Sequence, residues 1–383
     1  MTESEPPPND GEFTNTEYER LALASKINLS DGHARLPLTV DQRATIARTL
    51  EIFDEVMRTP QEDLEAVFIA SFFSCAGQVV RKSARGPFLN YSSSAAIKIA
   101  AQYCRIMGLQ VLLIEPCFDN IRHILLTEGV RVVALEEEML ADTDTIASIA
   151  GPGKAIWIVQ PNNPTGFALD RAQFEELVQV LSEAGSTLIV DYCFRFYMRQ
   201  LGTWDQYRTL TDSRCSYIAI EDTGKTWGLS DIKVGVTVCS ADASDLLSRL
   251  HDELLLNVSG LHLALLTAFI EDSMLNGLNM SIRQPIEDNR RLIHELVGPG
   301  LFGHASDYCC NVPMEFLRLP GESDAINFWK ELRASGVDVL PASNYYWTDT
   351  TLGRDSLRVP LARDPVDLKA AIPRLQQALR RRA

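Results

Sequence analysis

One lysine stands out in this chain by its position. Lysine is scarce, with 8 residues against 28 arginines, and Lys225 comes three residues after Asp222, the last residue of the apolar run SYIAIED. A lysine that is removed from water loses basicity and becomes a nucleophile that can form a Schiff base. Its place just beyond a buried strand is therefore typical of a reactive amine rather than of a solubilising surface residue.

Acid and amide side chains follow two other apolar runs. Asp191 ends the run STLIVD, and the run AIWIVQ leads into PNNPTG (161–166), a turn whose prolines and glycine fix the backbone around Asn162 and Asn163. A carboxylate that faces a pyridine nitrogen is the partner that makes pyridoxal phosphate (PLP) an electron sink. Lys225 and Asp191 together indicate a PLP site.

A run of hydroxyl side chains precedes an expected helix. Tyr91, Ser92, Ser93 and Ser94 stand directly before it. Hydroxyls and free N–H groups at the positive end of a helix dipole can hold a phosphate group. The alternative is a serine that only caps the helix.

Strands and helices alternate through the middle of the chain, which predicts a mostly parallel sheet between helices with its ligands at the carboxyl ends of the strands. The expected strands are 111–116, 130–135, 155–161, 186–192, 216–222 and 234–240. The expected helices are 93–107, 119–128 and 170–184.

Helical periodicity dominates before and after this region. It covers 41–58 and 61–76, and later 242–257, 259–275 and 279–297. A shorter α/β segment follows, with strands 314–319, 337–342 and 356–361, a helix at 323–335 and a helix at the C-terminus. We therefore expect an N-terminal arm or lid (1–40), a large domain (41–285) and a small C-terminal domain (286–383).

Composition excludes several classes of protein. The 383 residues carry a formal charge of −15, so no basic surface is expected to bind nucleic acid or an anionic membrane. No apolar run approaches the length of a membrane span, and the start MTESEPPPNDGEF is unlike a signal peptide, so we expect a cytoplasmic protein. The eight cysteines, including the adjacent Cys309 and Cys310, show no metal-ligand spacing and are expected to be buried free thiols, with no metal site.

In the order of these elements the chain resembles the fold-type I PLP enzymes of the aspartate aminotransferase superfamily. This resemblance implies a large domain with a mostly parallel seven-stranded sheet and a smaller C-terminal α/β domain. It also implies a role for each matching residue: Lys225 forms the Schiff base, Asp191 pairs with the pyridinium nitrogen, Asn163 reaches the ring hydroxyl, Phe118 stacks on the ring, Ser92 and Ser93 hold the phosphate, and Arg358 binds the substrate α-carboxylate.

Two positions depart from ordinary aminotransferases. Phe194 stands where those enzymes often have a tyrosine on the ring hydroxyl, and Lys233 stands where an arginine usually binds the phosphate. Lys233 keeps the positive charge without the fork geometry of arginine.

A narrower group shares these departures. The motifs NLSDGHAR (28–35), YSSS (91–94), FDNI (118–121) and IEDTGK (220–225) are similar to those of the PLP- and O2-dependent arginine oxidases and hydroxylases of the enduracididine and indolmycin pathways. This resemblance implies that Lys225 takes the Cα proton of L-arginine and that the coenzyme's electrons reduce O2 without metal or flavin. The products that it implies are a 2-oxo acid (2-ketoarginine, 4-hydroxy-2-ketoarginine or a 4,5-dehydro product), ammonia and hydrogen peroxide.

The same resemblance assigns the substrate side of the site. His33 is the expected active-site histidine, able to move protons or orient water. Asp222, Glu19 and Thr16 are expected to contact the substrate guanidinium, the last two from an N-terminal segment that closes over the substrate. From the residues alone, His33 reads as a surface histidine, Asp222 as part of a turn and the arm as an exposed helix.

Three functions stay open at this point. A conventional aminotransferase or an arginine-cyclising enzyme of the same fold would use Lys225, Asp191 and Arg358 equally, and a PLP-binding sensor would have no turnover. A homodimer is expected by resemblance. The apolar helices near 61–76 and 259–275 can supply its interface or belong to the core.

Overall fold

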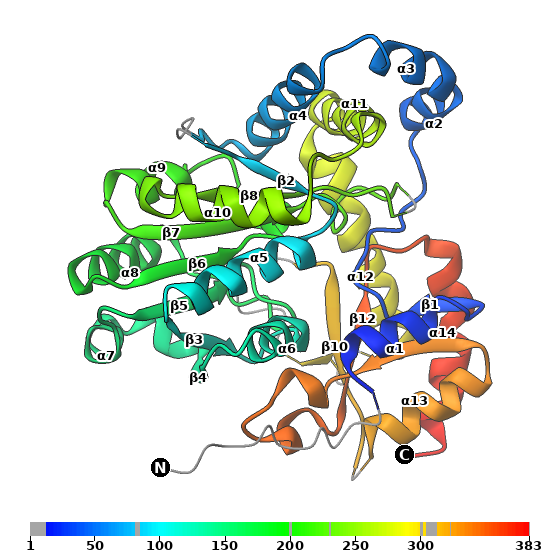
Figure 1. Ribbon diagram of the computed structural model, residues 1–383. Coiled ribbons are helices and arrows are strands. Elements are labelled where there is room, and N and C mark those ends of the chain that lie inside the picture. The colour runs from blue at the N-terminus through cyan, green and yellow to red at the C-terminus, as the bar shows by residue number, and fades with distance from the viewer. Residues whose placement is uncertain are drawn as a thin grey trace.

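Seven strands form the larger sheet, as expected for the fold class (Figure 1). The structure, a computed structural model, describes residues 13–80, 85–198, 201–229, 231–298, 302–303, 312–321 and 323–382. The strand order is β2-β8-β7-β6-β5-β3-β4. The strands are β2 (Phe88–Asn90), β3 (Gln110–Glu115), β4 (Val132–Glu136), β5 (Lys154–Val159), β6 (Thr187–Asp191), β7 (Ser216–Asp222) and β8 (Gly235–Cys239).

The centre of this sheet is parallel. Strands β7, β6, β5, β3 and β4 run in one direction, whereas β8 is antiparallel to β7 and β2 is antiparallel to β8. Strand β6 is buried along its whole length, as its apolar run predicts for a strand covered on both faces. The carboxyl ends of β6 and β7 therefore lie side by side and bring Asp191 and Asp222 to one edge.

Helices pack against the sheet in two groups whose members contact one another. The first group is α5 (Ser93–Ile106), α6 (Asp119–Thr127) and α10 (Ala241–Leu254). The second group is α7 (Thr143–Ile149), α8 (Arg171–Ala184) and α9 (Gln206–Asp212). Helix α8 begins at a capping box formed by Asp170 and Gln173 and ends at Gly185, whose φ of 67° is a conformation that favours glycine.

A smaller sheet has the order β1-β11-β12-β10-β9. Its strands are β1 (Ile27–Leu29), β9 (Phe302–Gly303), β10 (Met314–Arg318), β11 (Val337–Pro341) and β12 (Ser356–Pro360), and its helices are α12 (Gln284–Val297), α13 (Ala325–Ala334) and α14 (Pro365–Arg380). Strand β1, which the sequence pattern did not predict, pairs in parallel with β11. Part of the expected arm is thus an edge strand of the small sheet, and the domain boundaries stay a prediction.

Five further α-helices lie in the described part of the chain, and two of the helices expected from the sequence are interrupted or begin later than predicted. The five are α1 (Asn15–Ala22), α2 (Val40–Ala47), α3 (Thr49–Val56), α4 (Gln61–Ala76) and α11 (Gly260–Asn276). The expected helix 41–58 breaks at Arg48, where the Thr49 hydroxyl donates to the carbonyl oxygen of Ile46 and competes with the helical pattern. The expected helix 279–297 begins as a π-turn over Asn279–Arg283, and the α-helix starts only at Gln284, beside Pro285.

The two apolar helices named as interface or core pack against each other. Helix α4 contacts α11, and its Phe68, Phe72 and Phe73 are buried. Six free cysteines are buried as expected, at 75, 104, 117, 193, 215 and 239, whereas Cys309 and Cys310 lie outside the described residues. In the part of the chain that the structure describes, no helix combines the length and the apolar character that crossing a bilayer requires.

Candidate active site

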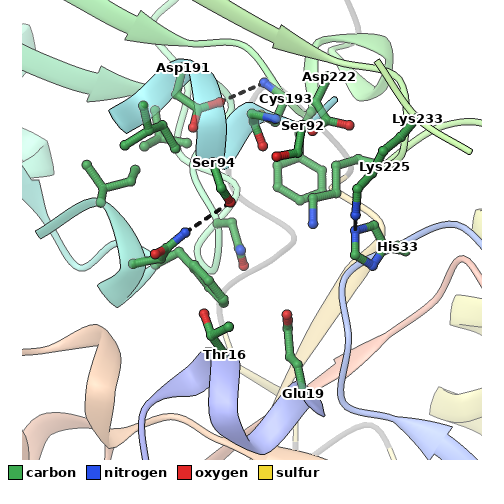
Figure 2. Close-up of a pocket in the computed structure, with 18 of the residues that line it drawn as sticks. Thr16, Glu19, His33, Ser92, Ser94, Asp191, Cys193, Asp222, Lys225 and Lys233 are labelled. Carbon is green, nitrogen blue, oxygen red and sulfur yellow. Dashed lines mark hydrogen bonds between the residues drawn. The ribbon is translucent and has the colours of Figure 1, made fainter. Parts of the chain in front are cut away.

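A cavity of about 470 Å³ lies at the carboxyl edge of the larger sheet. Its walls come from the ends of β6 and β7, the start of α5, the loop after β1, strand β12 and helix α1. Figure 2 shows Thr16 and Glu19 projecting into it from α1, opposite Asp191 and Ser92. All the site residues expected from the sequence line this cavity: Thr16, Glu19, His33, Ser92, Ser93, Phe118, Asn163, Asp191, Asp222, Lys225, Lys233 and Arg358.

Asp191 is a buried carboxylate at the end of β6. Its Oδ1 accepts a hydrogen bond from the backbone N–H of Cys193 at 2.9 Å, which fixes the side chain at the cavity wall. Burial raises the pKa of Asp191, an effect that the hydrogen bonds from Cys193 only partly offset. A buried carboxylate of this kind is stabilised by a cationic partner such as a pyridinium N–H.

The PNNPTG turn presents Asn163 to the cavity and is held from behind. Asn162 Nδ2 donates to Glu137 at 2.6 Å and to the carbonyl of Pro116 at 2.7 Å, and the Thr165 hydroxyl donates to the same glutamate at 2.8 Å. Burial raises the pKa of Glu137 to about 7. The tyrosine hydroxyl of Tyr345 lies 3.5 Å from Asn163 Oδ1. The turn thus fixes Asn163 at the cavity wall, where its side-chain amide can donate and accept hydrogen bonds.

Lys225 follows the end of β7 and is half-buried. The hydroxyl of Tyr197, a buried side chain, donates to the backbone carbonyl of Lys225 at 2.9 Å. This bond fixes the backbone from which the amine extends into the cavity.

The start of α5 joins the sheet through Asp222. The backbone N–H of Ser93 donates to Asp222 Oδ2 at 2.9 Å, and the N–H of Gly224 donates to Oδ1 at 2.6 Å. Ser92 is the N-cap, since its hydroxyl accepts from the N–H of Ala95 at 3.3 Å. Ser92 therefore caps helix α5, which is the alternative role given for this serine. Asp222 lines the cavity and also accepts hydrogen bonds from two backbone amides.

Gly235, on β8, explains how closely the start of α5 approaches the sheet. A Cβ atom at this position would lie 2.7 Å from the backbone carbon of Ser92 and 3.0 Å from the nitrogen of Ser93. Real Cβ atoms do not approach backbone atoms so closely, so only glycine fits here without a shift of α5.

Arg358, on β12, is fully buried and pairs with helix α1. Its Nη2 donates to Glu19 at 2.9 Å and also contacts the carbonyl oxygen of Ser30. Its Nε and Nη1 have no hydrogen-bond partner among the residues that the structure describes. A Cβ at Gly32 would lie 3.6 Å from both Arg358 Nη1 and Lys225 Nζ, so the guanidinium and the amine face the same small space.

His33 reaches the cavity from the loop after β1. Its Nε2 lies 2.9 Å from Lys233 Nζ, a contact drawn in Figure 2. The positive charge of Lys225, together with burial, lowers the pKa of His33 below its ordinary value of 6.5. The histidine is thus neutral near pH 7.

Helix α1 is docked on the body of the protein. The N–H of Asn15 donates to Asp119 Oδ2 at 2.9 Å, and Asn344 Nδ2 donates to the carbonyl of Phe13 at 2.7 Å. Tyr18 does not line the cavity, and its ring packs 4.8 Å from that of Trp329. Tyr18 therefore anchors the helix, and the other face of the helix carries Thr16 and Glu19 over the cavity.

Comparison of the sequence with models of known protein families identifies the family of this chain. Residues 24–375 match the family model described as aminotransferase class I and II. The chain belongs to this family. It is a fold-type I PLP-dependent enzyme, as the order of its motifs indicates.

Individual relatives match shorter stretches. Histidinol-phosphate aminotransferase 1 of Dechloromonas aromatica is 23% identical over 212 residues, which are 55% of this chain and 55% of that protein. Histidinol-phosphate aminotransferase of Thermococcus kodakarensis is 31% identical over 31% of this chain and 32% of its own length. The alignments thus span about half or less of the curated relatives.

Solved structures of related proteins match nearly the whole chain. The structure of MppP soaked with its product 2-ketoarginine superposes with a TM-score of 0.84 at 27% identity, covering 92% of this chain and 99% of MppP. Aspartate aminotransferase of Thermus thermophilus with maleate gives a TM-score of 0.76 at 15% identity, covering 96% and 97% of the two chains. The second similarity concerns the fold alone.

The donor set of the cavity fits PLP, the cofactor of this family. A buried carboxylate (Asp191), an amine (Lys225), an amide (Asn163) and an aromatic ring (Phe118) line one cavity. Serine hydroxyls and the Lys233 ammonium line the same cavity. The amine can bond the aldehyde, the carboxylate can pair with the ring nitrogen, and the cationic wall suits a phosphate.

Several residues that shape the site were missed by the sequence analysis. Cys193, Ile97 and Val159 line the cavity beside the expected residues. Asn120 and Ile121 line it too, and the motif FDNI (118–121) contains them without a predicted role. Glu137 and Tyr197 hold site residues from behind the cavity, and no local pattern marks them because each lies at least 25 positions from its partner. Asp119 belongs to the FDNI motif, but that motif does not predict its contact with Asn15 across 104 positions.

Proposed function

We propose that this enzyme uses PLP and O2 to oxidise L-arginine to a 2-oxo acid. In the simplest form, one arginine, one O2 and one water give 2-ketoarginine, ammonia and hydrogen peroxide. Products that are hydroxylated at Cγ or desaturated between Cγ and Cδ need a second O2 and belong to the same proposal. The similarity to MppP, whose product is 2-ketoarginine, supports this choice.

One observation on this chain carries the proposal. The N-terminal segment places Thr16, Glu19 and His33 in the same cavity as Lys225 and Asp191. These three residues are among the four, with Asp222, that the resemblance to the arginine oxidases and hydroxylases places on the substrate side. The segment thus adds an acid, a hydroxyl and an imidazole to a coenzyme site.

The charges of the cavity suit an amino acid with a cationic side chain. Arg358 offers two buried guanidinium nitrogens that lack a partner in the described part of the chain, and a carboxylate is the ligand that this geometry favours. Glu19, on α1, and Asp222, at the end of β7, are carboxylates that line the same cavity. Glu19 accepts from Arg358, and Asp222 accepts from two backbone amides, but each carboxylate keeps further acceptor sites that can receive a guanidinium. The two ends of arginine therefore have complementary partners.

The residues of the chain divide the work of the reaction. Lys225 accepts the proton from the substrate Cα at its Nζ, because its amine and Arg358 face the same small space. PLP, when bound, takes up the electron pair released at Cα and makes it available to O2. His33, neutral near pH 7, accepts or returns a proton where oxygen is reduced or water adds. Helix α1 covers the cavity and keeps bulk water out.

Oxygen consumption decides the proposal. Purified enzyme loaded with PLP is mixed with L-arginine in the absence of any 2-oxo acid acceptor. O2 uptake and peroxide release are measured. The products are identified by mass spectrometry after reactions in labelled O2 and in labelled water. We expect O2 uptake with peroxide release and a 2-oxo acid of arginine. Turnover that occurs only after a 2-oxo acid acceptor is added contradicts the proposal.

A conventional aminotransferase is the second candidate. It is favoured by the curated relatives, which are histidinol-phosphate aminotransferases. That function predicts amino transfer from a substrate to a 2-oxo acid acceptor, with no O2 uptake. Parallel assays with histidinol phosphate and with L-arginine, each with and without acceptor, separate the two functions.

We also propose that the enzyme is a homodimer. Large apolar side chains are exposed on α3 and just after it, at Leu50, Phe53 and Met57, and a surface of this kind is typical of an interface between chains. Light scattering is expected to give about twice the chain mass of 42.7 kDa. A mass of a single chain at micromolar concentration contradicts this part of the proposal.

A further inference from the structure

Two residues with separate expected roles are in contact. Lys233 was expected to hold the coenzyme phosphate, and His33 was expected to act on the substrate side. In the structure, Lys233 Nζ lies 2.9 Å from His33 Nε2, although the two residues are 200 positions apart. An ammonium has only hydrogen-bond donors, so the imidazole must accept this bond at Nε2.

The other side of the imidazole faces an acid. His33 Nδ1 lies 3.6 Å from Asp31 Oδ1, and the backbone N–H of His33 donates to the same oxygen at 3.0 Å. Arg363, which is fully buried, donates to the carbonyl oxygen of His33 at 2.6 Å and to Asp31 Oδ1 at 3.1 Å. The loop that carries His33 is thus fixed at its backbone, and a proton on Nδ1 points to a carboxylate.

The charges around Asp31 keep it ionised. Burial by itself raises the pKa of Asp31, but the hydrogen bond with His33 and the charges of Arg363 and Arg35 outweigh burial and lower it. Among the residues that the structure describes, Asp231 also faces His33, at 3.8 Å from Nδ1 with a mostly exposed side chain. Both acids lie on the Nδ1 side, whereas the cations Lys225 and Lys233 oppose a positive charge on the ring.

We propose that Lys233 is a positioning residue for His33, whose ammonium holds the imidazole as the neutral tautomer with its proton on Nδ1 and its lone pair on Nε2 at the cavity wall. Asp31 completes the arrangement from the opposite side. A tautomer fixed by a partner on the second nitrogen is how proteins set the role of a histidine. This inference rests on the proposed function only for its effect on products.

The consequence is tested with a pair of variants of the PLP-loaded enzyme. Lys233→Met removes the charge and the donor, and Lys233→Arg keeps both. Each is assayed at saturating PLP, so that a weakened phosphate site does not mask the result, and each is also made in a His33→Ala background. If K233M does not take up PLP, K233A, which also lacks the charge and the donor, replaces it with the same expectation.

We expect K233M to shift the product ratio toward the unmodified 2-oxo acid by about tenfold, the direction that we also expect of His33→Ala. The magnitude is taken from metal sites, where the outer partner that orients a ligating histidine contributes about 10–100-fold. K233R restores the ratio to near that of the parent enzyme. In the His33→Ala background, K233M adds nothing further. An unchanged ratio in K233M, or an equal shift in both backgrounds, overturns the inference.

A second measurement does not depend on turnover. The six histidines of the holoenzyme are followed by NMR of labelled rings, with His33 assigned from the His33→Ala spectrum. K233M is expected to raise the pKa of His33, because a positive neighbour is removed while Asp31 stays. A His33 titration that is the same in both proteins overturns the inference, even if arginine is not the substrate. Absence of O2 uptake by the parent enzyme instead rejects the proposed function.

Discussion

The two sides of the cavity are built in different ways. The coenzyme side lies on the larger sheet, where Asp191 and Asp222 end neighbouring parallel strands and Lys225 follows three residues later. The substrate side combines the N-terminal segment with a strand near the C-terminus, since Glu19 pairs with Arg358 across 339 positions. One side is set by a rigid sheet, and the other is assembled by docking a short helix.

This difference teaches which interactions can move. The residues of β6 are buried and bonded on both edges, so the floor of the cavity is fixed. Helix α1 has only eight residues and depends on a few contacts to the body, such as that of Asn15 with Asp119. A short helix is marginal without its tertiary contacts. Changes on the sheet side should therefore affect coenzyme binding, and changes on the arm side should affect substrate binding while coenzyme binding persists.

The largest effect is expected from removal of the amine on the sheet side. Lys225→Ala should abolish the visible absorbance of the bound coenzyme and lower turnover by at least about a thousandfold, the scale seen when a principal catalytic group is lost. Absorbance spectra and O2 uptake check this. Lys369→Ala, at an exposed lysine of α14, is the matched control and should change neither. A K225A variant that keeps both the visible absorbance and the activity would contradict the assignment of Lys225 as the residue that bonds the coenzyme.

A change on the substrate side should separate the two regions. Arg358→Gln removes the equivalent of one charge-assisted hydrogen bond, worth about 1.5–3 kcal/mol, so KM for the amino acid should rise roughly 10–150-fold. Uptake of PLP, measured by titration of its absorbance, should persist. Arg354→Gln, at a side chain with 70% exposure, is the control. Loss of PLP affinity to the same extent as the loss of substrate affinity would show that the two sides are not separable.

A smaller effect is expected where α5 meets the sheet. Gly235→Ala places a Cβ against the backbone of Ser92, and overpacking of this kind typically costs about 1–3 kcal/mol. The displaced helix start should weaken PLP binding by about tenfold, read from the absorbance titration, with KM changed much less. Cys239→Ala, at the far end of the same strand, serves as the control. Unchanged PLP affinity in G235A would separate the start of α5 from the phosphate site.

The smallest effect concerns the docking of α1 and its dependence on pH. Burial raises the pKa of Asp119 from its ordinary value of 3.8 to about 7. Because the docked state holds a proton that the open state releases, docking should weaken as the pH rises from about 4 through 7. Hydrogen exchange of the α1 amides, corrected for intrinsic rates, should show more protection at pH 5 than at pH 8, by a few-fold. Asp119→Asn should remove this pH dependence, whereas Asp144→Asn, at an exposed acid, should keep it.

Most elements were predictable where the chain has a long regular pattern. The expected helix 61–76 and strand 216–222 match α4 and β7 residue for residue, because amphipathic or apolar runs with clear ends define them. The three-residue strands β1 and β2 were missed, since three residues carry no periodicity. The broken helix after Val40 was missed because a threonine hydrogen bond, not a helix breaker, interrupts it.

The sequence by itself determined the kind of site. The types of Lys225, Asp191, Asn163 and Arg358 and their order specify the coenzyme chemistry, because parallel strands place their carboxyl ends on one edge whatever the loops between them do. Only the tertiary structure decided which side chains hold one another. The contacts of Lys233 with His33, of Glu19 with Arg358 and of Asp119 with the start of α1 join segments 104 to 339 positions apart. Such pairings depend on how the small sheet and α1 pack beside the large sheet, which a local pattern in a chain does not encode.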